Sequence, residues 1–303
     1  MLCKVKYICS MKKWFFVTRP WSFVVSATPV IATTLFLFWK VGGAGIDWLN
    51  AFLALVGIIL FHAAGNVHSD YYDYTTGIDS KDAYCIQNLV SGEYTPKQYR
   101  NFSLILLAAG IVVGLILTLR SGWPLLVIGG LGCLLTLLYP WTKFHALGDT
   151  DIFLLFGVLP MLGTAFVTTG VIDWSTLLLS VPVGFITVAV LHSNNTRDIP
   201  SDSAAGAKSF AKVIGEKASM WWYIILISVP CIYTVCAVLC KAFPWWCLLI
   251  VLSLPIVAGN IRQALRYRTE GLAAFNKLDL MTAKLQMISG ITLCLGFLLG
   301  ALL

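Results

Sequence analysis

The chain has 303 residues, of which 58% are hydrophobic and 12% charged, with 21 Lys and Arg against 14 Asp and Glu. A soluble globular domain carries about 25% charged residues, so this composition excludes a water-soluble domain, a disordered chain and a collagen, and it favours a bilayer as the solvent. The net charge of +7 is scattered through short gaps between apolar runs, so we expect no nucleic-acid partner.

Nine runs of mainly apolar residues are long enough to cross a hydrocarbon core about 30 Å thick, which takes about 20 residues per helix. In chain order they cover 17–39, 48–68, 101–119, 123–141, 152–171, 175–194, 220–240, 244–261 and 283–303. The fold class predicted is therefore an all-α polytopic membrane protein with nine transmembrane helices. Residues 17–303 are expected to form a single domain, and residues 1–16 a basic flank in which either Met1 or Met11 is the start. The first run continues without a cleavage site, so we expect it to stay in the mature chain.

The basic residues predict the orientation of these helices. If successive gaps alternate between the two sides of the membrane, all but three of the 21 Lys and Arg fall on the side of the amino terminus; the exceptions are Lys40, Arg120 and Lys241. Because basic residues concentrate on the inner side, the amino terminus is expected to be cytoplasmic and the carboxyl terminus outside, in the cell inner (cytoplasmic) membrane. The acids follow the bases: all but Asp47 and Asp173 lie on the same side, although acids contribute little to topology. The functional site is therefore predicted on the cytoplasmic face.

Cysteine and histidine do not form a recognisable site. Most of the nine cysteines lie within apolar runs and no C-x-x-C pair occurs, so we interpret them as small hydrophobic residues. The four histidines, His62, His68, His145 and His192, do not group with cysteines at the spacing of zinc ligands, so zinc is not predicted.

A first polar cluster lies at the inner end of the second run, over residues 66–79. It contains Asn66, Ser69, Asp70, Asp73 and Asp79. If the helix continues through Asp73, then Asn66, Asp70 and Asp73 share one face. Carboxylates placed so close together would repel one another unless a cation lay between them.

A second cluster, over residues 194–202, lies at the end of the sixth run and places Asp198 and Asp202 one helical turn apart. The two clusters occupy corresponding inner ends four helices apart, which indicates an internal pseudo-repeat. Clustered oxygen ligands without His or Cys favour Mg²⁺, which usually takes one or two carboxylates plus substrate phosphates. Lys143, Arg197 and Lys208 lie near the clusters and carry positive charge suited to phosphate oxygens. Ordinary solvated helix ends would explain one such cluster, but not two on one face.

These residues resemble the UbiA superfamily of intramembrane prenyltransferases, and within it the 1,4-dihydroxy-2-naphthoate polyprenyltransferases of menaquinone (vitamin K2) biosynthesis. The most specific matching segments are DYYDYTTGID from Asp70, LVSGEYTPKQ from Leu89 and HSNNTRDIPSD from His192; TRPWS from Thr18 and YPWTK from Tyr139 match more weakly. The resemblance implies nine helices around a central cavity, with Mg²⁺ held between the two Asp-rich motifs and a polyprenyl diphosphate bound there.

The resemblance also assigns roles residue by residue. It implies that Asp73, Asp198 and Lys143 are catalytic. The implied metal ligands are Asp70, Asp73, Asp79, Asp198 and Asp202, and the implied diphosphate-binding residues are Asn66, Tyr139, Lys143, Asn195, Arg197 and Lys208. In the family an asparagine stands where this chain has Ser69, so either Ser69 or Asn66 is expected to fill that place.

The implied reaction is Mg²⁺-dependent transfer of the polyprenyl group to 1,4-dihydroxy-2-naphthoate, which gives demethylmenaquinone with loss of carbon dioxide and diphosphate. The same chemistry on another acceptor, such as 4-hydroxybenzoate, a protohaem or a glycerol phosphate derivative, is the alternative. A cation or phosphate transporter is a more distant one, because transporter sites lie near the bilayer midplane and these clusters do not. We expect membrane lipid around the chain and no obligatory protein partner.

Overall fold

The structure, a computed structural model, describes residues 13–77, 88–204 and 206–303. Within these ranges nine helical segments are long and apolar enough to cross a membrane. They are Pro20–Val41, Trp48–Thr75, Pro96–Ser121, Pro124–Lys143, Gly148–Thr169, Trp174–Arg197, Glu216–Leu239, Trp245–Phe275 and Leu278–Leu302. The predicted all-α class with nine spans is therefore confirmed for the part of the chain that is described.

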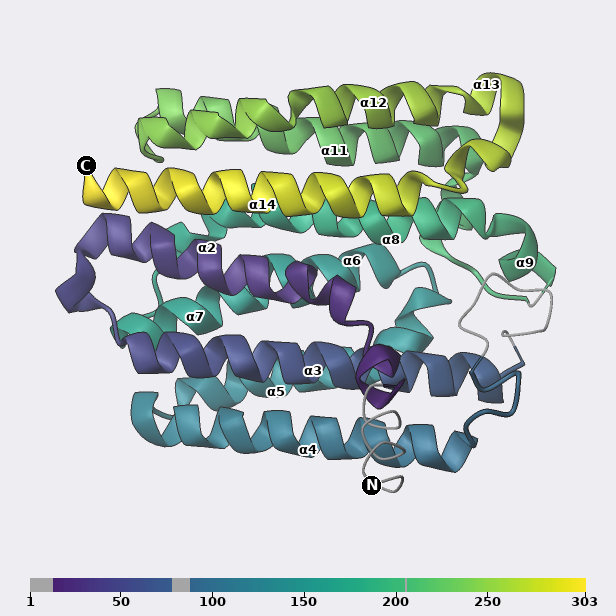
Figure 1. The fold of residues 1–303 in the computed structure, drawn as a ribbon, viewed down its shortest axis with the longest axis horizontal. Coiled ribbons are helices and arrows are strands. Elements are labelled where there is room, and N and C mark those ends of the chain that lie inside the picture. The colour runs from purple at the N-terminus through teal and green to yellow at the C-terminus, as the bar shows by residue number, and fades with distance from the viewer. Residues whose placement is uncertain (1–12, 78–87, 205) are drawn as a thin grey trace, which may run out of the picture.

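The long helices lie side by side along one common direction (Figure 1). At one edge of the bundle lie α11 (Glu216–Leu239) and α12 (Leu254–Leu265), with α14 (Leu278–Leu302) next to them. At the other edge lie α3 (Trp48–Thr75), α4 (Pro96–Ser121) and α5 (Pro124–Lys143), and α2 (Phe23–Val41) lies between α14 and α3.

Several spans are not continuous α-helices. The fifth consists of α6 (Gly148–Phe153), the π-helical turn η3 (Leu154–Val158) and α7 (Leu159–Thr169). The sixth consists of the 3-10 helix η4 (Trp174–Leu179), the π-helical turn η5 (Ser180–Gly184) and α8 (Phe185–Arg197). The eighth consists of η6 (Trp245–Ser253), α12, α13 (Tyr267–Glu270) and η7 (Gly271–Phe275). Short helices η1 (Pro20–Ser22), η2 (Gly43–Gly45), α9 (Ile199–Ala204) and α10 (Phe210–Ile214) occupy the connections.

The two π-helical turns cross where each has a glycine. A Cβ atom added to Gly157 would lie 3.1 Å from the Cα atom of Gly184, so the two backbones approach closely because neither residue has a side chain. Each of the two π-helical turns has a proline in it or next to it: Pro182 lies in η5, and Pro160 follows η3 in α7. A proline has no N–H to donate to the regular helical pattern, which favours an irregular turn there.

Helix α3 continues seven residues beyond the end predicted from hydropathy and reaches Thr75. Its polar extension is held by packing: Val67 and Tyr99 of α4 are buried in one cluster with Val17 and Leu89. A capping box of Thr95 and Gln98 fixes the start of α4 beside it. This extension places Asp70 and Asp73 within the helix.

The two ends of the bundle differ in their charges. At the end that carries the carboxyl termini of α3, α5 and α8, here called the aspartate end, the predicted motifs lie together. At the opposite end, Lys40 pairs with Asp173 at 2.7 Å and Arg120 pairs with Asp47 at 3.0 Å, which ties α2 to η4 and α4 to the start of α3. The site is therefore built at the aspartate end.

Candidate active site at the aspartate end

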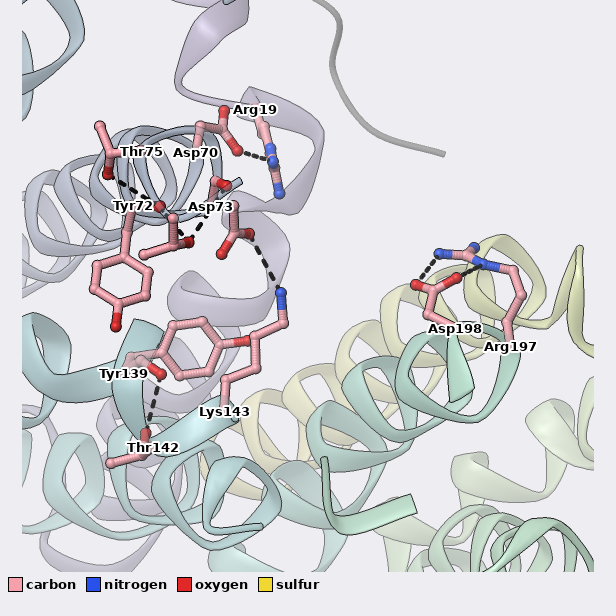
Figure 2. A network of polar contacts seen from close by, with 11 residues as sticks. Arg19, Asp70, Tyr72, Asp73, Thr75, Tyr139, Thr142, Lys143, Arg197 and Asp198 are labelled. Atoms are coloured by element: carbon pink, nitrogen blue, oxygen red, sulfur yellow. Dashed lines mark hydrogen bonds and ion pairs between the residues drawn. The ribbon is translucent and has the colours of Figure 1, made fainter. Parts of the chain in front are cut away.

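The two aspartates of the first motif are buried and each faces a cation. Asp70 is 7% exposed and Asp73 is 9% exposed. Arg19 forms an ion pair with Asp70, and the Nζ atom of Lys143 lies 3.4 Å from Oδ2 of Asp73 (Figure 2). The other oxygen of Asp73, Oδ1, has no hydrogen-bond partner among the described residues. Because a buried carboxylate oxygen without a partner is costly, this oxygen is suited to a cation or to a donor from a ligand.

Arg19 reaches Asp70 because the chain turns sharply before the first span. Arg19 has φ +56°, in the left-handed region that residues other than glycine seldom adopt, and Pro20 follows it at the start of η1. Ser22 and Thr18 add hydrogen bonds from their hydroxyl groups to backbone carbonyls in the same turn. The strained turn therefore presents the guanidinium group to a buried carboxylate 51 residues away in sequence.

The second motif begins where α8 ends. The guanidinium group of Arg197 donates two hydrogen bonds of 2.8 Å to the two oxygens of Asp198 and a third of 2.9 Å to Asp279 at the start of α14. Figure 2 shows the Arg197–Asp198 pair apart from the group formed by Asp73 and Lys143. In this arrangement Arg197 occupies one lone pair on each oxygen of Asp198, and the remaining lone pairs of this partly exposed carboxylate can accept a further ligand.

Asp202, in α9, connects the second motif to the first. It is 7% exposed, and its Oδ2 atom has no hydrogen-bond partner among the described residues. Burial raises the pKa of the Asp202 carboxyl above its usual range, while the nearby charge of Lys143 acts to lower it. Lys143 therefore interacts with an aspartate from each motif.

Backbone contacts hold the chain after α5 against the chain after α9. The N–H of Ala146 donates to the carbonyl of Lys208 at 2.7 Å, and the N–H of Lys208 donates to the carbonyl of Phe144 at 3.1 Å. Lys208 thus lies beside the end of α5, with its own side chain exposed. Two more buried aspartates, both in α6, connect this helix to its neighbours. Asp151 accepts a hydrogen bond from Thr142 of α5, and Asp149 contacts the Nδ1 atom of His192 of α8 at 2.7 Å.

The remaining predicted residues lie around the same end, except one. Asn66 donates its amide N–H groups to the carbonyl of Thr18 at 3.0 Å and to the hydroxyl of Ser22 at 3.1 Å. Asn195, in α8, is 3% exposed, and its Nδ2 atom has no hydrogen-bond partner within the described ranges. Tyr139 lies one helical turn before Lys143 in α5. Asp79 lies outside the described residues.

A large cavity begins beside these residues and extends between the helices. Its volume is about 990 Å³, and its wall is made mainly of apolar side chains from α2, α3, α4, α5, α7 and α14. Asn66, Tyr139 and Asn194 line it near the aspartate end, whereas Ser69 does not line it. Of the two candidates for the family's asparagine position, Asn66 is therefore the one that faces the cavity. The volume is at the upper end of that of ordinary ligand pockets.

The described residues do not contain a complete metal cage, since no three of their His, Cys, Asp and Glu side chains lie close enough together to hold an ion. Oxygen donors are nevertheless present in the form that Mg²⁺ requires: Asp73 and Asp202 each keep one buried oxygen to which no described residue donates a hydrogen bond. A site with one or two carboxylates, completed by phosphate oxygens and water, is the ordinary arrangement for Mg²⁺ in proteins that bind phosphorylated substrates.

Comparison with known proteins identifies the family of the chain. Residues 30–301 match the UbiA prenyltransferase family. The chain belongs to this family. The UbiA prenyltransferase domain-containing protein 1 of Gallus gallus is 34% identical over 290 residues, which cover 93% of this chain and 83% of the relative. The Homo sapiens protein of the same name is 32% identical and is covered to 82%. These relatives establish an enzyme of the prenyltransferase type without naming an acceptor.

Solved structures with lower sequence identity share the fold. A UbiA homologue from Aeropyrum pernix has a TM-score of 0.66 at 14% identity, over 89% of this chain and 96% of that one. A UbiA homologue from Archaeoglobus fulgidus bound to DMAPP and Mg²⁺ has a TM-score of 0.57 at 14% identity, over 92% of this chain and 99% of that one. At this identity the likeness concerns the fold alone.

Sequence analysis missed residues that the fold brings to the site. The basic-residue pattern uses Arg19 only as one of the cations on the amino-terminal side, and the TRPWS segment that contains it matches the family weakly. Asp279, 82 residues from its partner Arg197, gave no local signal. His62 was considered only as a zinc ligand, but its side chain lines the cavity.

Proposed function

We propose that this enzyme transfers a polyprenyl group from a polyprenyl diphosphate to an aromatic acceptor in a Mg²⁺-dependent reaction. The observation that carries the proposal is a pair of buried carboxylate oxygens, from Asp73 and Asp202, that have no hydrogen-bond partner within the described ranges. Both aspartates interact with Lys143, next to a large and mainly apolar cavity. Charged groups for a diphosphate and apolar space for a hydrocarbon chain thus adjoin each other.

The metal would be held by the acids of the two motifs, Asp73 and Asp79 in the first and Asp198 and Asp202 in the second, with Asp70 beside them. When bound, Mg²⁺ neutralises the charge that develops on the departing diphosphate. Arg197 would orient Asp198 for this role, because its two hydrogen bonds leave a lone pair on each oxygen of that carboxylate.

The protein's own residues would bind the diphosphate, position the substrate and exclude water. Lys143 and Arg197 would stabilise the negative charge of the leaving group, with Lys208 at the edge of the site. Tyr139 and Asn66 line the cavity where it meets the charged site, and Asn195 would contribute its buried amide from α8. The apolar wall would keep water away from the allylic carbon while its bond to oxygen breaks.

The cavity also reaches the outside of the bundle. Among its lining residues, Ile111 and Leu115 of α4 and Leu126 of α5 are exposed on the flank that would face lipid. A polyprenyl chain longer than the cavity could therefore extend into the bilayer, which explains why such an enzyme would work inside a membrane.

We propose 1,4-dihydroxy-2-naphthoate as the first acceptor to test; the transfer itself gives demethylmenaquinol, the reduced form of demethylmenaquinone. Lys284 of α14 lines the cavity and would complement the acceptor's carboxylate. 4-Hydroxybenzoate carries the same group and is the alternative acceptor. We further propose that the aspartate end faces the cytoplasm, as the distribution of Lys and Arg predicts.

The experiment uses the purified full chain in detergent or lipid vesicles, with a labelled polyprenyl diphosphate and each acceptor in turn, with and without Mg²⁺. A prenylated, decarboxylated naphthol that forms only with Mg²⁺ would support both the reaction and the acceptor. Product from 4-hydroxybenzoate alone would keep the reaction and replace the acceptor. Absence of product from every aromatic acceptor would contradict the proposal and favour transport of a cation or phosphate, which ion flux into vesicles would reveal.

A further inference from the structure

His62 lies in the wall of the cavity, away from the two aspartate motifs. Its half-buried side chain extends from α3 toward the start of α2, where its Nδ1 atom lies 3.0 Å from the hydroxyl oxygen of Ser26 and its Nε2 atom 3.4 Å from that of Ser22. The rings of Phe23 and Phe156 flank the imidazole, with ring centroids 5.8 and 5.2 Å away. The imidazole is thus fixed in position by two serines and two aromatic rings.

The lengths of the two serine contacts indicate which nitrogen is available. Both hydroxyl groups donate to backbone carbonyls, Ser26 to Phe23 and Ser22 to Arg19, so both oxygens can accept a proton from the imidazole. The contact from Nδ1 to Ser26, at 3.0 Å, is shorter than the 3.4 Å contact from Nε2 to Ser22, which favours the proton on Nδ1. Ser26 does not line the cavity, whereas Ser22 does, so Nε2 is the nitrogen on the cavity side. With Nδ1–H bonded to Ser26, Nε2 carries a lone pair and has only a long contact to Ser22.

The distance of His62 from the aspartates along α3 leaves space for a diphosphate between them. His62 precedes Asn66 by one helical turn and Asp70 by two, on the same face of α3. With a rise of about 1.5 Å per residue, it lies roughly 12 Å from Asp70 along the helix axis. A diphosphate held at the aspartates would occupy the nearer part of that distance, so the acceptor ring would lie beside His62.

No other side chain in the described cavity wall is a neutral group that can accept a proton. The other charged or titratable groups there are Arg19 near the start of α2, Cys133 and Tyr139 of α5, and Asp279 and Lys284 of α14; the described cavity residues of α4 and α7 contribute none. Arg and Lys are cations, Asp279 is paired with Arg197, and the thiol and phenol are weak acids that keep their protons near neutral pH. Only the imidazole can accept a proton there.

We infer that His62 is the general base that removes the proton from a hydroxyl group of the aromatic acceptor through Nε2. This inference rests on the proposed prenyl transfer. As the proton moves to His62, the ring carbon forms a C–C bond to the allylic carbon, and the C–O bond to diphosphate breaks with its electron pair leaving on the diphosphate. The ring carbon then loses its hydrogen ion to water, or carbon dioxide where it bears a carboxylate, and the imidazolium returns its proton to the acceptor oxygen.

The test compares His62→Gln with the wild type and with the control His68→Gln. Glutamine can keep a hydrogen bond to Ser26 but cannot act as a base. His68 lies in the same helix but does not line the cavity. For His62→Gln we expect kcat to fall about 100-fold, the contribution typical of a general base, while the KM for polyprenyl diphosphate stays unchanged. His68→Gln should keep the wild-type rate.

Two further readouts separate a base from a structural residue. In the wild type, kcat should rise with pH as the imidazole loses its proton, and this limb should be absent in His62→Gln. Fluorinated acceptors with more acidic hydroxyl groups should restore the rate of His62→Gln relative to the wild type. Because that comparison uses ratios between acceptors within one preparation, partial misfolding of the variant does not affect it.

The outcomes distinguish the two proposals. Product from the wild type together with an undiminished rate and an unchanged pH profile in His62→Gln would overturn the role of His62 alone. A slow His62→Gln variant with an unchanged pH profile and equal losses on all acceptors would also overturn it and indicate a packing role. A wild type without product from any hydroxylated aromatic acceptor would overturn the proposed function and the base together.

Discussion

Lys143, the last residue of α5, holds Asp73 of α3 through a contact of 3.4 Å between its Nζ atom and the carboxylate. Both groups are largely withdrawn from water, so removing the cation would leave a buried negative charge and take away a ligand for the diphosphate. We expect Lys143→Met to lower kcat about 100-fold, as the loss of one charge-stabilising donor does in other active sites. Lys143→Arg keeps the charge and should lose much less. Steady-state rates at saturating Mg²⁺ check this, and equal losses in both variants would show that shape rather than charge matters.

The two aspartates of the first motif should differ in their effect on the metal. Both carboxylates face a cation, but Asp70 is paired with Arg19, whereas Asp73 is paired with Lys143, which also interacts with Asp202 of the second motif. We therefore expect Asp73→Asn to raise the half-saturating Mg²⁺ concentration more than tenfold, and Asp70→Asn to raise it by about tenfold or less, as changes beside a ligand do. Titration of activity with Mg²⁺ measures both. A larger effect of Asp70→Asn would mean that Arg19 gives up its partner when the metal binds.

Arg197 bonds to two aspartates for which we expect different roles. Asp198 is the proposed metal ligand, and Asp279 holds the guanidinium group of Arg197 in position. Asp198→Asn should abolish Mg²⁺-dependent turnover if its carboxylate binds the metal. Asp279→Asn should keep kcat but raise the KM for polyprenyl diphosphate several-fold, because Arg197 stays charged yet loses its bond to α14. Similar kinetics in the two variants would indicate that Asp198 serves only to orient Arg197.

Sequence alone predicted the parts of the fold that follow from local hydropathy. Each of the nine apolar runs became a span because a bilayer accepts only segments whose backbone groups are satisfied internally. It did not predict that α3 extends to Thr75, because the polar stretch around Asp70 and Asp73 is kept helical by Val67 and Tyr99, a contact with another helix.

The site residues likewise fall into those that local sequence reveals and those that only the fold brings together. The motif acids and Lys143 were recognisable because their residue types and spacing carry the chemistry. The ion pairs from Arg19 to Asp70 and from Arg197 to Asp279 were not, because they join residues 51 and 82 positions apart. Arg19 also depends on a left-handed backbone conformation that no residue preference would suggest.

A variant of Lys284 tests whether this residue binds the carboxylate of the acceptor. The side chain of Lys284 lines the cavity from α14, and it adds a positive charge to a wall that is mainly apolar. If it binds the carboxylate, Lys284→Met should raise the KM for 1,4-dihydroxy-2-naphthoate about tenfold, the loss expected for one charge-assisted hydrogen bond, and should leave the KM of a naphthol without a carboxylate unchanged. Equal changes for both acceptors would place the carboxylate elsewhere in the cavity.

The crossing of the two π-helical turns predicts a stability effect that is independent of catalysis. A Cβ atom at Gly184 would lie 2.9 Å from the ring of Phe153 and 3.0 Å from the Cα atom of Gly157, so both the ring and the backbone of η3 would have to shift. Gly184→Ala should therefore destabilise the protein by about 1–3 kcal/mol, the usual cost of overpacking. Gly259 in α12 is the matched control, because a Cβ atom there meets nothing within 4 Å. Gly259→Ala should be neutral or stabilising by up to about 1 kcal/mol, since alanine is the better helix former. Thermal unfolding in one detergent compares the two variants directly, and equal melting temperatures would mean that the fifth and sixth spans can separate at the crossing without cost.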